Sequence, residues 1–534
     1  MSIATKYFFN AALRNVVEHG DTDIFPFPIE NHILHDKCKE VSDLLRKARS
    51  YFSKCFAQYP PSHINTLAPV SLTGFRSATQ QDPFWNVFLL GSSLSIAPQI
   101  EAARIPPDKK IIFSYRYNES LSDGKLFRDD IGWSDFIRHS VSMAERFKYV
   151  VVCDIADCYQ RISHHRLDNA LEQLADHEPA RSHIMKVMKH FSNTKSYGLP
   201  VGGPAARMLV ELVLNLTDQI LLSHQVQFCR YADDYHIFVD SYDKAFERLH
   251  FMSDKFLRND GLTLQKSKTR IMSSAEFKSA YSHLVDPEQD TNSDVQKLFA
   301  LKLRYDPYSA NASEEYAELR KELQKIDILG LLNRELAKTR VHGALTKKLI
   351  AAVRHLETSV KTNAVLTLVD NMDALYALFP VLAVTIKTCL ADLSEAARQK
   401  IGEALRKRVI GESYILNNEL HAAYAVRIFS EMKTADNFEV LVTLYNRFRG
   451  PLVRRDVILV MAKWRNYPFL SDQIGEYTGA SPWERRALII ASYFMGDSGG
   501  HWRQSMVKQF NPFELIVRDW AAEKYGQSGW SLPI

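Results

Sequence analysis

The sequence predicts an α+β region up to about residue 285, followed by an all-helical region. Two observations favour the α+β class. Residues 149–155 form a continuous apolar run typical of a buried strand, and residues 227–239 place aromatic and β-branched residues on both sides of an Asp-Asp pair, as in a hairpin. The third observation is that strand-like runs become scarce past about residue 290, where apolar residues recur with the helical period.

Bulk composition limits the class of protein. A chain of 534 residues is too long for one ordinary core, so we expect roughly two to four domains. Its 46% hydrophobic and 24% charged residues are typical of a soluble globular protein. A net charge of +5 permits a nucleic-acid partner only if the positive charges cluster. The six cysteines form no CxxC pair and no Cys/His metal spacing, which indicates reduced thiols.

Targeting signals are not evident in the sequence. The first residues show no basic segment followed by an apolar core and a cleavage site. No apolar run approaches the roughly 18 residues that a membrane-spanning helix needs. We therefore expect a soluble, cytoplasmic protein with no membrane partner.

The amino-terminal part is expected to be mostly helical. Residues 5–18 have the pattern of an amphipathic helix, the prolines within 20–28 force extended chain, and a second helical pattern runs over about 32–56. Residues 63–120 are expected to be irregular. They carry arginines that either bind phosphates or nucleic acid or serve as surface and ion-pair residues, and these are Arg76, Arg104 and Arg116.

The strand at 149–155 follows a predicted helix over 132–147 and places Asp154 at its end. An acid that ends a buried strand is costly unless it is paired or ligates a metal. A further helix is expected to begin near residues 161–164. The neighbouring His164 and His165 have no partner at ligand spacing, so we interpret them as capping or surface residues.

A Gly/Pro turn over 198–204 precedes an apolar helix over 205–223, whose first turn can offer free backbone N–H groups to a phosphate. The hairpin over 227–240 then carries Asp233 and Asp234 at its tip. Two adjacent carboxylates repel each other, and a divalent metal is the usual counter-charge, although a solvated turn is the alternative interpretation. A helix over about 242–258 and a basic strand over 261–271 follow.

The carboxy-terminal half is expected to consist of stacked helix pairs, as in HEAT-type solenoids, although no repeated sequence is evident. The polar stretch 285–292 marks the boundary. The predicted helices cover residues 313–326, 328–338, 344–356, 373–389, 393–409, 435–448, 481–494 and 512–524.

The order of these parts resembles the palm of a reverse transcriptase, over roughly residues 10–280. Residues 152–159 resemble motif A of that family, 198–204 motif B, the YADD segment at 231–234 motif C, and 262–269 motif D. The resemblance implies a fingers and amino-terminal region over 1–125, a palm over 126–285 and an α-helical repeat domain over 290–534.

The resemblance also implies the chemistry. Nucleotidyl transfer by this family uses two Mg²⁺ ions, which lower the pKa of the attacking 3′-hydroxyl and stabilise the leaving pyrophosphate. Asp154, Asp233 and Asp234 are the implied catalytic residues, with Asp154 and Asp233 essential and Asp234 in support. The implied metal-binding positions are these three together with Ile155.

Five further residues are implied to bind the incoming dNTP: Arg76, Tyr159, Val201, Gly202 and Lys268. Tyr159 matches the aromatic residue that packs under the sugar, where a bulky ring clashes with a 2′-hydroxyl and favours deoxynucleotides. Val201 stands where templated enzymes usually carry Gln, which removes an amide near the template. Lys268 matches the motif D lysine, which acts near the triphosphate as a general acid; a surface lysine on a strand is the alternative.

The motif B departure, the segment 20–26 and the helical carboxy-terminal half resemble one branch of the family, the bacterial anti-phage reverse transcriptases. The resemblance implies DNA synthesis in response to phage by a cytoplasmic homo-oligomer. In some members synthesis is untemplated and primed by a protein hydroxyl, which leaves the DNA attached to the protein; in others a companion non-coding RNA is the template. Two alternatives stay open: a retron-like or domesticated mobile-element enzyme, and a catalytically idle palm that serves as a scaffold or RNA-binding module.

Overall fold

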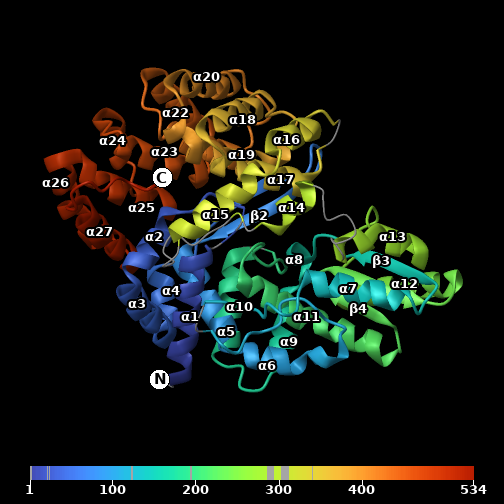
Figure 1. The fold of residues 1–534 in the computed structure, drawn as a ribbon. Helices are drawn as coiled ribbons and strands as arrows, with labels where there is room; N and C mark the ends of the chain where they lie inside the picture. The colour runs from blue at the N-terminus through green and yellow to red at the C-terminus, as the bar shows by residue number, and fades with distance from the viewer. Residues whose placement is uncertain are drawn as a thin grey trace.

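The computed structural model describes residues 3–534 apart from 21, 23, 122–123, 193–194, 286–293, 302, 304–311 and 339–340. Figure 1 shows amino-terminal helices, a mixed region around a small sheet, and a helical region that packs over the amino-terminal helices. The boundary expected at residues 285–292 falls almost entirely outside the described residues, and no helix of the described chain is long and apolar enough to cross a bilayer. All six cysteines are free thiols.

The amino-terminal part differs from its prediction in two places. The helix expected over 32–56 is divided among α2, α3 and α4, and the region expected to be irregular holds an antiparallel hairpin followed by two helices. The elements are α1 (Ile3–His19), α2 (Ile29–Asp36), α3 (Cys38–Ser50), α4 (Phe52–Gln58), β1 (His63–Pro69), β2 (Phe75–Gln81), α5 (Pro83–Leu94) and α6 (Ala97–Ala103).

The local reasons for these differences can be found in the chain. Asp82 caps α5 by accepting hydrogen bonds from the backbone N–H groups of Phe84 and Trp85, and Pro83 occupies the first turn, where its missing N–H costs nothing. Every residue of α5 is buried, so the helix lacks the polar stripe that periodicity detects. The β1 and β2 strands are rich in polar residues, which hid their alternation.

The mixed region is built on a four-stranded antiparallel sheet of order β4-β5-β3-β6. Its elements are α7 (Trp133–Ala144), β3 (Tyr149–Asp154), α8 (Cys158–Arg161), α9 (His164–Glu172), α10 (Ala180–Ser192), α11 (Pro204–Ser223), β4 (Phe228–Tyr231), β5 (Asp234–Val239), α12 (Tyr242–Lys255), a π-helical turn (Phe256–Asp260), β6 (Arg270–Ser273) and α13 (Ser274–Val285). The basic strand expected from residue 261 begins only at Arg270, because residues 266–268 form a turn.

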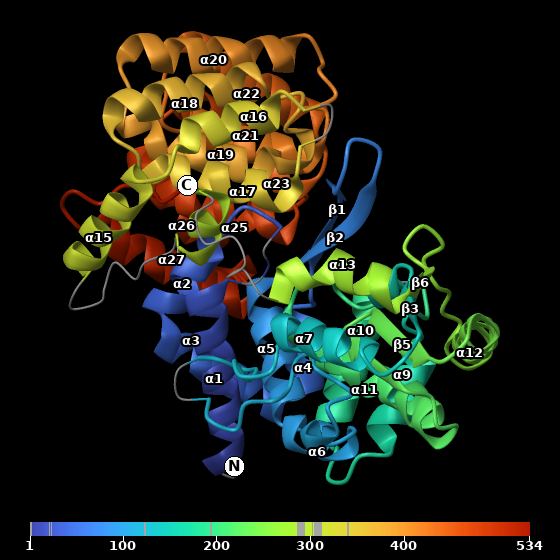
Figure 2. The same cartoon turned by 45° about the vertical axis from the view of Figure 1, so that its right-hand side comes forward.

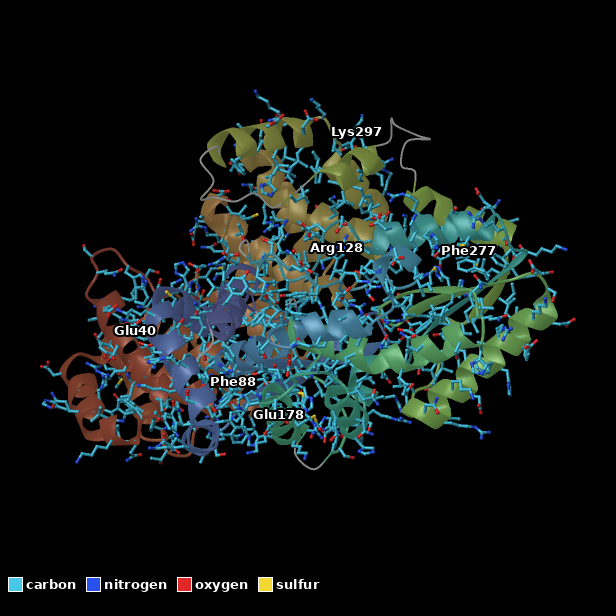
Figure 3. All side chains as sticks on the ribbon, turned by 90° about the horizontal axis from the view of Figure 1, so that it is seen from below. Glu40, Phe88, Arg128, Glu178, Phe277 and Lys297 are labelled. Carbon is cyan, nitrogen blue, oxygen red and sulfur yellow. The ribbon has the colours of Figure 1, made fainter. Side chains whose placement is uncertain are left out.

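Helices cover both faces of this sheet. α7 and α13 pack on one face, and α12 packs on the other. Phe277 points from α13 onto the sheet, where its ring lies 5.0 Å from that of His236, and Phe88 lies in the core of the amino-terminal helices (Figure 3). Val150 and Val151 face opposite cores, so β3 is buried on both sides, as its continuous apolar run predicted.

The carboxy-terminal region is helical in all its described elements. α17, α19, α21, α23, α25 and α27 pack successively in one row, and α18, α20 and α22 form a second row. The helices are α14 (Asp294–Ala300), α15 (Ala312–Gln324), α16 (Ile328–Leu336), α17 (Gly343–Ala352), α18 (Thr358–Asp370), α19 (Phe379–Cys389), α20 (Glu395–Ile410), α21 (Glu419–Phe429), α22 (Ala435–Arg447), α23 (Pro451–Lys463), α24 (Tyr467–Ile474), α25 (Pro482–Ala491), α26 (Gly496–Met506) and α27 (Pro512–Tyr525).

Several of these helices were not predicted, namely α14, α18, α21, α23, α24 and α26. In α21 and α23 nearly every residue is buried, so their sequences lack an apolar stripe against a polar face. The helix expected over 373–389 begins only at Phe379, because Pro380 has no N–H to donate and belongs in a first turn.

The helical region is fixed to the amino-terminal part by buried contacts. The Arg486 guanidinium of α25 donates to Glu30 (2.7 Å) and Asp82 (2.9 Å), and all three side chains are fully buried. α27 packs on α2 and α3, and α21 packs on β1. Figure 2 shows the β1–β2 hairpin standing beside the helical region. The carboxy-terminal helical region is therefore packed onto the amino-terminal helices α2 and α3 and onto the β1–β2 hairpin.

Candidate active site

Three aspartates meet where β3 ends and β5 begins. Asp154, the last residue of β3, is the register partner of Asp234, the first residue of β5. Asp233 lies in the turn between β4 and β5, and its carbonyl accepts a 3.0 Å hydrogen bond from the backbone N–H of Ile155. Ala232, at φ 54°, takes the left-handed conformation that the tight turn requires. The antiparallel register therefore brings the three acids together.

Burial and mutual repulsion make it costly to ionise all three carboxyl groups at once. Asp154 is only 6% exposed. Burial, followed by the charge of Asp154, raises the pKa of Asp233. Burial, followed by the charges of Asp233 and Asp154, raises the pKa of Asp234 to about 7. A compensating cation is needed to keep all three carboxylates ionised at neutral pH.

Lys268 supplies part of this compensation. Its ammonium group donates a 2.6 Å hydrogen bond to Asp154 Oδ2. Burial opposes the charge of Lys268, but the hydrogen bond and the charge of Asp154 raise its pKa. The loop that carries it is tied to β3 by a 2.7 Å bond from the Gln265 N–H to the Asp154 carbonyl. Lys268 therefore lies at the acids with a side chain that is 61% exposed, and it sits in a turn and not on a strand.

The chemistry of the donor set fits a divalent cation. Carboxylate oxygens are the ligands that Mg²⁺ prefers, and they are provided by Asp154 and Asp234 on adjacent strands and by Asp233 in the turn before β5. The Ile155 side chain is buried and apolar, which leaves only its backbone carbonyl as a ligand. As the side chains lie, with the Lys268 ammonium on Asp154, no three acidic, His or Cys residues within the described ranges enclose a metal ion.

Two of the predicted nucleotide-binding residues, Tyr159 and Arg76, lie on elements that contact each other, α8 and β2. Tyr159, half-buried on α8, follows Asp154 by five positions, and its carbonyl accepts a 2.8 Å hydrogen bond from the Leu199 N–H. Gln160 Nε2 reaches the Ser77 carbonyl of β2 at 3.5 Å. This contact joins β2 to α8, and the side chain of Arg76, the neighbour of Ser77, is exposed.

The turn before α11 is shaped by its glycines. Gly198 and Gly202 have φ values of 103° and 116°, which side chains rarely adopt. A Cβ on Gly202 would also lie 3.1 Å from the Thr22 hydroxyl, so the amino-terminal segment touches this turn. Val201 and Gly202, which both belong to this turn, are half-buried.

The two neighbouring histidines are placed differently. His164 is buried and structural, with its Nε2 2.8 Å from the Gly198 carbonyl, whereas His165 is exposed.

A buried ionic network beneath the acids was not predicted. The Arg230 guanidinium, fully buried on β4, bonds Glu211 (2.9 Å) and Asp218 (2.6 Å) of α11, and it donates a 2.9 Å hydrogen bond to the Ala232 carbonyl. It thereby fixes the turn that holds Asp233. The available signal was the seven-residue spacing of Glu211 and Asp218, which places two acids on one face of an otherwise apolar helix.

Two of the three arginines considered for phosphate binding belong to structural ion pairs. Arg104 bonds Glu211 at 2.6 Å, and Arg116 bonds Glu101 at 2.9 Å. Both guanidinium groups are buried, so neither faces a ligand. Of the three, only Arg76 keeps an exposed side chain.

One protein-family model matches the part of the chain that contains the four-stranded sheet. Residues 95–330 match the model of a protein family described as reverse transcriptase (RNA-dependent DNA polymerase). The matched range includes the three aspartates, Tyr159, the turn before α11 and Lys268, whereas Arg76 lies outside it. A solved structure of telomerase from Candida albicans, in complex with a TWJ fragment of telomeric RNA, is similar over 67% of this chain and 70% of that chain, at 12% identity and a TM-score of 0.31. No curated protein matches the chain.

Proposed function

Because this chain carries a reverse transcriptase domain and is an RNA-directed DNA polymerase, we propose that it synthesises DNA from dNTPs at Asp154, Asp233 and Asp234. The observation that carries the proposal is the meeting of these acids where β3 ends and β5 begins, where burial and then their mutual repulsion raise the pKa of Asp234 to about 7. Such a site favours binding of divalent cations.

Each of these residues has a separate role in the proposed reaction. Asp154 and Asp233 hold Mg²⁺, and Asp234 supports them from the start of β5. Two bound Mg²⁺ ions supply activation of the 3′-hydroxyl and neutralisation of the leaving pyrophosphate. Lys268, now paired with Asp154, carries a proton within reach of the same site and serves as the general acid toward the leaving group.

The incoming nucleotide is held from both sides in this proposal. Arg76 of β2 contacts the triphosphate from the fingers, and Tyr159 packs under the sugar and excludes a 2′-hydroxyl. Val201 and Gly202 line the base. The contact between Gln160 and the Ser77 carbonyl supports this arrangement, because it brings β2 to the helix that carries Tyr159.

The biological role that we propose is anti-phage defence in the bacterial cytoplasm by a homo-oligomer. Val201 in place of a template-contacting Gln supports synthesis that is untemplated and protein-primed, or templated by an associated non-coding RNA. Two rows of stacked helices fixed onto the fingers support a HEAT-like accessory domain.

The test uses purified protein with Mg²⁺ and each labelled dNTP, first without template or primer. Products are resolved before and after protease and nuclease treatment. Polymer that stays attached to protein until proteolysis supports protein-primed synthesis, and co-purified RNA is then sequenced. Polymer that forms only on a supplied RNA template and primer, and follows its sequence, favours the retron-like or domesticated mobile-element enzyme.

One variant tests the proposed site and a second variant serves as its matched control. Asp233→Ala removes a carboxylate from the proposed site, and Asp240→Ala removes an exposed one just after β5. We expect loss of incorporation in the first and normal incorporation in the second. Equal activity in both variants would exclude the assigned site and revive the idle-palm alternative.

A further inference from the structure

We propose that Arg207, in the first turn of α11, binds a phosphate group of a substrate at a cavity beside the β4–β5 hairpin. The inference rests on the proposed function and deepens it, because the phosphate belongs either to a bound nucleic-acid strand or to the dNTP of the same reaction. Three observations carry it: a guanidinium group without a counter-ion, a helix end without an acid, and a cavity that both of them border.

The guanidinium group of Arg207 has no acidic partner. The residue is half-buried, and within the described part of the chain its side chain forms no ion pair and no hydrogen bond. It lies against the ring of Tyr115, 5.3 Å from the ring centroid, at cation–π distance. An aromatic face attracts the positive charge but leaves the five N–H donors in the guanidinium plane unused. These donors are therefore available to an anionic ligand.

The start of α11 also lacks a negative charge. The helix begins at Pro204, and its N-cap residue Gly203 forms no side-chain hydrogen bond. The first turn contains no acidic residue and instead carries the cation of Arg207. Because the amino-terminal end of a helix has a partial positive charge, it favours anions and disfavours cations. One bound anion compensates both the helix end and Arg207.

A cavity of about 300 Å³ lies against this helix end. Its lining includes Arg207 and Gly202, Asn15 of α1, and the pair Lys125 and Asp129. Lys125 and Asp129 bond each other at 2.5 Å, so their charges cancel. Arg207 therefore gives the described lining an excess positive charge at neutral pH. A volume at the lower end of the range for small-ligand sites accommodates a phosphate with part of its nucleoside.

A second polar group in the cavity lining lacks a partner. Asn15 is only 5% exposed; its Nδ2 donates to the Gly124 carbonyl at 2.8 Å, and its Oδ1 has no hydrogen-bond partner among the described residues. A buried acceptor of this kind is costly unless a bound molecule donates to it. The lining is therefore complementary to a ligand that combines an anionic group with N–H or O–H donors. A nucleotide unit combines them, through its phosphate and its hydroxyl or amine groups.

Ring contacts join Arg207 to the hairpin that carries the acids. The ring of Tyr115, which Arg207 contacts, lies 5.9 Å from that of Tyr231. Tyr231 precedes Asp233 by two positions on that hairpin. A phosphate bound by Arg207 is thus held next to the proposed reaction centre, where it belongs to a substrate of the same reaction.

A purely structural role for Arg207 makes a different prediction. If Arg207 only packs on Tyr115, Arg207→Met keeps most of that packing and leaves ligand binding unchanged. If it binds a phosphate of a strand, its loss weakens binding and also makes binding less dependent on salt, because each phosphate contact releases counter-ions. A folding defect lowers the amount of active protein without changing that dependence. Arg207→Lys, which keeps the charge, should retain the dependence on salt.

The experiment uses the full-length protein with Ca²⁺ in place of Mg²⁺, so that ligands bind without turnover. Binding of fluorescein-labelled oligo(dT) is followed by anisotropy over a series of NaCl concentrations, and binding of labelled dTTP by equilibrium dialysis. We expect Arg207→Met to weaken binding about tenfold or more and Arg207→Lys to recover part of that loss. For oligo(dT), the slope of log affinity against log salt should become shallower by about 0.7. Arg46→Met, at an exposed arginine of α3 paired with Asp43, is the matched control and should behave like wild type.

The two ligands identify the source of the phosphate. A loss for oligo(dT) assigns it to a bound strand, and a loss for dTTP alone assigns it to the triphosphate. Wild-type protein that binds neither ligand would overturn the proposed function, and the inference with it.

Three results would overturn the inference alone. They are wild-type affinity for both ligands in Arg207→Met, a loss for oligo(dT) with an unchanged salt slope, and a loss for dTTP that is equally large in Arg207→Lys. If Arg207→Met does not fold, Lys125→Glu decides, because it reverses an exposed charge at the same cavity. Wild-type affinity for both ligands in Lys125→Glu would then overturn the inference.

Discussion

Asp234→Asn should stabilise the protein at alkaline pH when no metal is present. The pKa of Asp234 is raised from 3.8 to about 7, first by burial and then by Asp233 and Asp154. The folded state therefore binds a proton more tightly than the unfolded state, so the carboxyl group lowers stability progressively as pH rises from about 4 to about 7. An Asn side chain keeps a hydrogen-bond donor toward Asp154 and carries no charge at any pH.

The size of the effect follows from the pKa. The interval from 3.8 to about 7 corresponds to roughly 4 kcal/mol at 1.36 kcal/mol per pH unit. Because the side chain is partly exposed and its surroundings relax, we expect about 2 to 4 kcal/mol in the free energy of unfolding above pH 7. For a cooperative unit of the size of the sheet region, this corresponds to a rise in Tm of roughly 5 to 15 °C.

The assay is thermal unfolding of wild type and variant from pH 5.5 to 8.5 in EDTA, repeated with Mg²⁺. The difference in Tm should be about half its full size at pH 5.5, which lies midway between 3.8 and 7, and should reach its full size by about pH 8. It should shrink when Mg²⁺ is added, since a bound cation compensates the charge that Asn removes. Asp240→Asn, at an exposed aspartate just after β5, should show no such difference. A Tm for Asp234→Asn equal to or below wild type at pH 8 in EDTA would refute the electrostatic reasoning.

Three further substitutions test buried contacts and the turn before α11. Arg230→Met leaves two buried carboxylates without a partner and should lower the free energy of unfolding in urea by about 3 to 5 kcal/mol. Arg138→Met breaks only an exposed ion pair and should lower it by under about 1 kcal/mol. Similar losses in the two variants would contradict a stabilising role for the buried network. Arg486→Met should cost about as much as Arg230→Met and should increase proteolytic cleavage between the helical region and the amino-terminal part; unchanged proteolysis would argue against that contact. Gly202→Ala places a side chain at φ 116° and should lower dNTP incorporation at least tenfold, while Gly343→Ala, at an open helical position, should leave it unchanged.

The sequence predicted the parts of the fold whose patterns are local. The apolar run of β3, the hairpin of β4 and β5 and the amphipathic helices α15, α20, α22 and α27 were expected and are confirmed. Elements buried on every side, such as α5, α21 and α23, carry no periodic contrast and were missed. The β1–β2 hairpin was missed because its polar residues resemble a loop.

The residues of the candidate site differ in how much of their role the sequence indicated. The three aspartates stood out because an acid at the end of a buried strand and a pair at a hairpin tip are costly without a partner, and the resemblance to the reverse transcriptase palm implied their catalytic role. The contacts of Arg230 with Glu211 and Asp218 join two different elements, β4 and α11. The spacing of Glu211 and Asp218 marks two acids on one face of an apolar helix, but only the folded arrangement shows that Arg230 lies against that face.

The proposal that three aspartates hold two catalytic cations is tested most directly by counting bound metal. Mn²⁺ is titrated into the full-length protein with a non-hydrolysable dNTP, and binding is followed by electron paramagnetic resonance. We expect about two tightly bound ions in wild type and in Asp240→Asn, and at least one fewer in Asp154→Asn and Asp233→Asn. The same number of tightly bound ions in all four proteins would contradict the assignment.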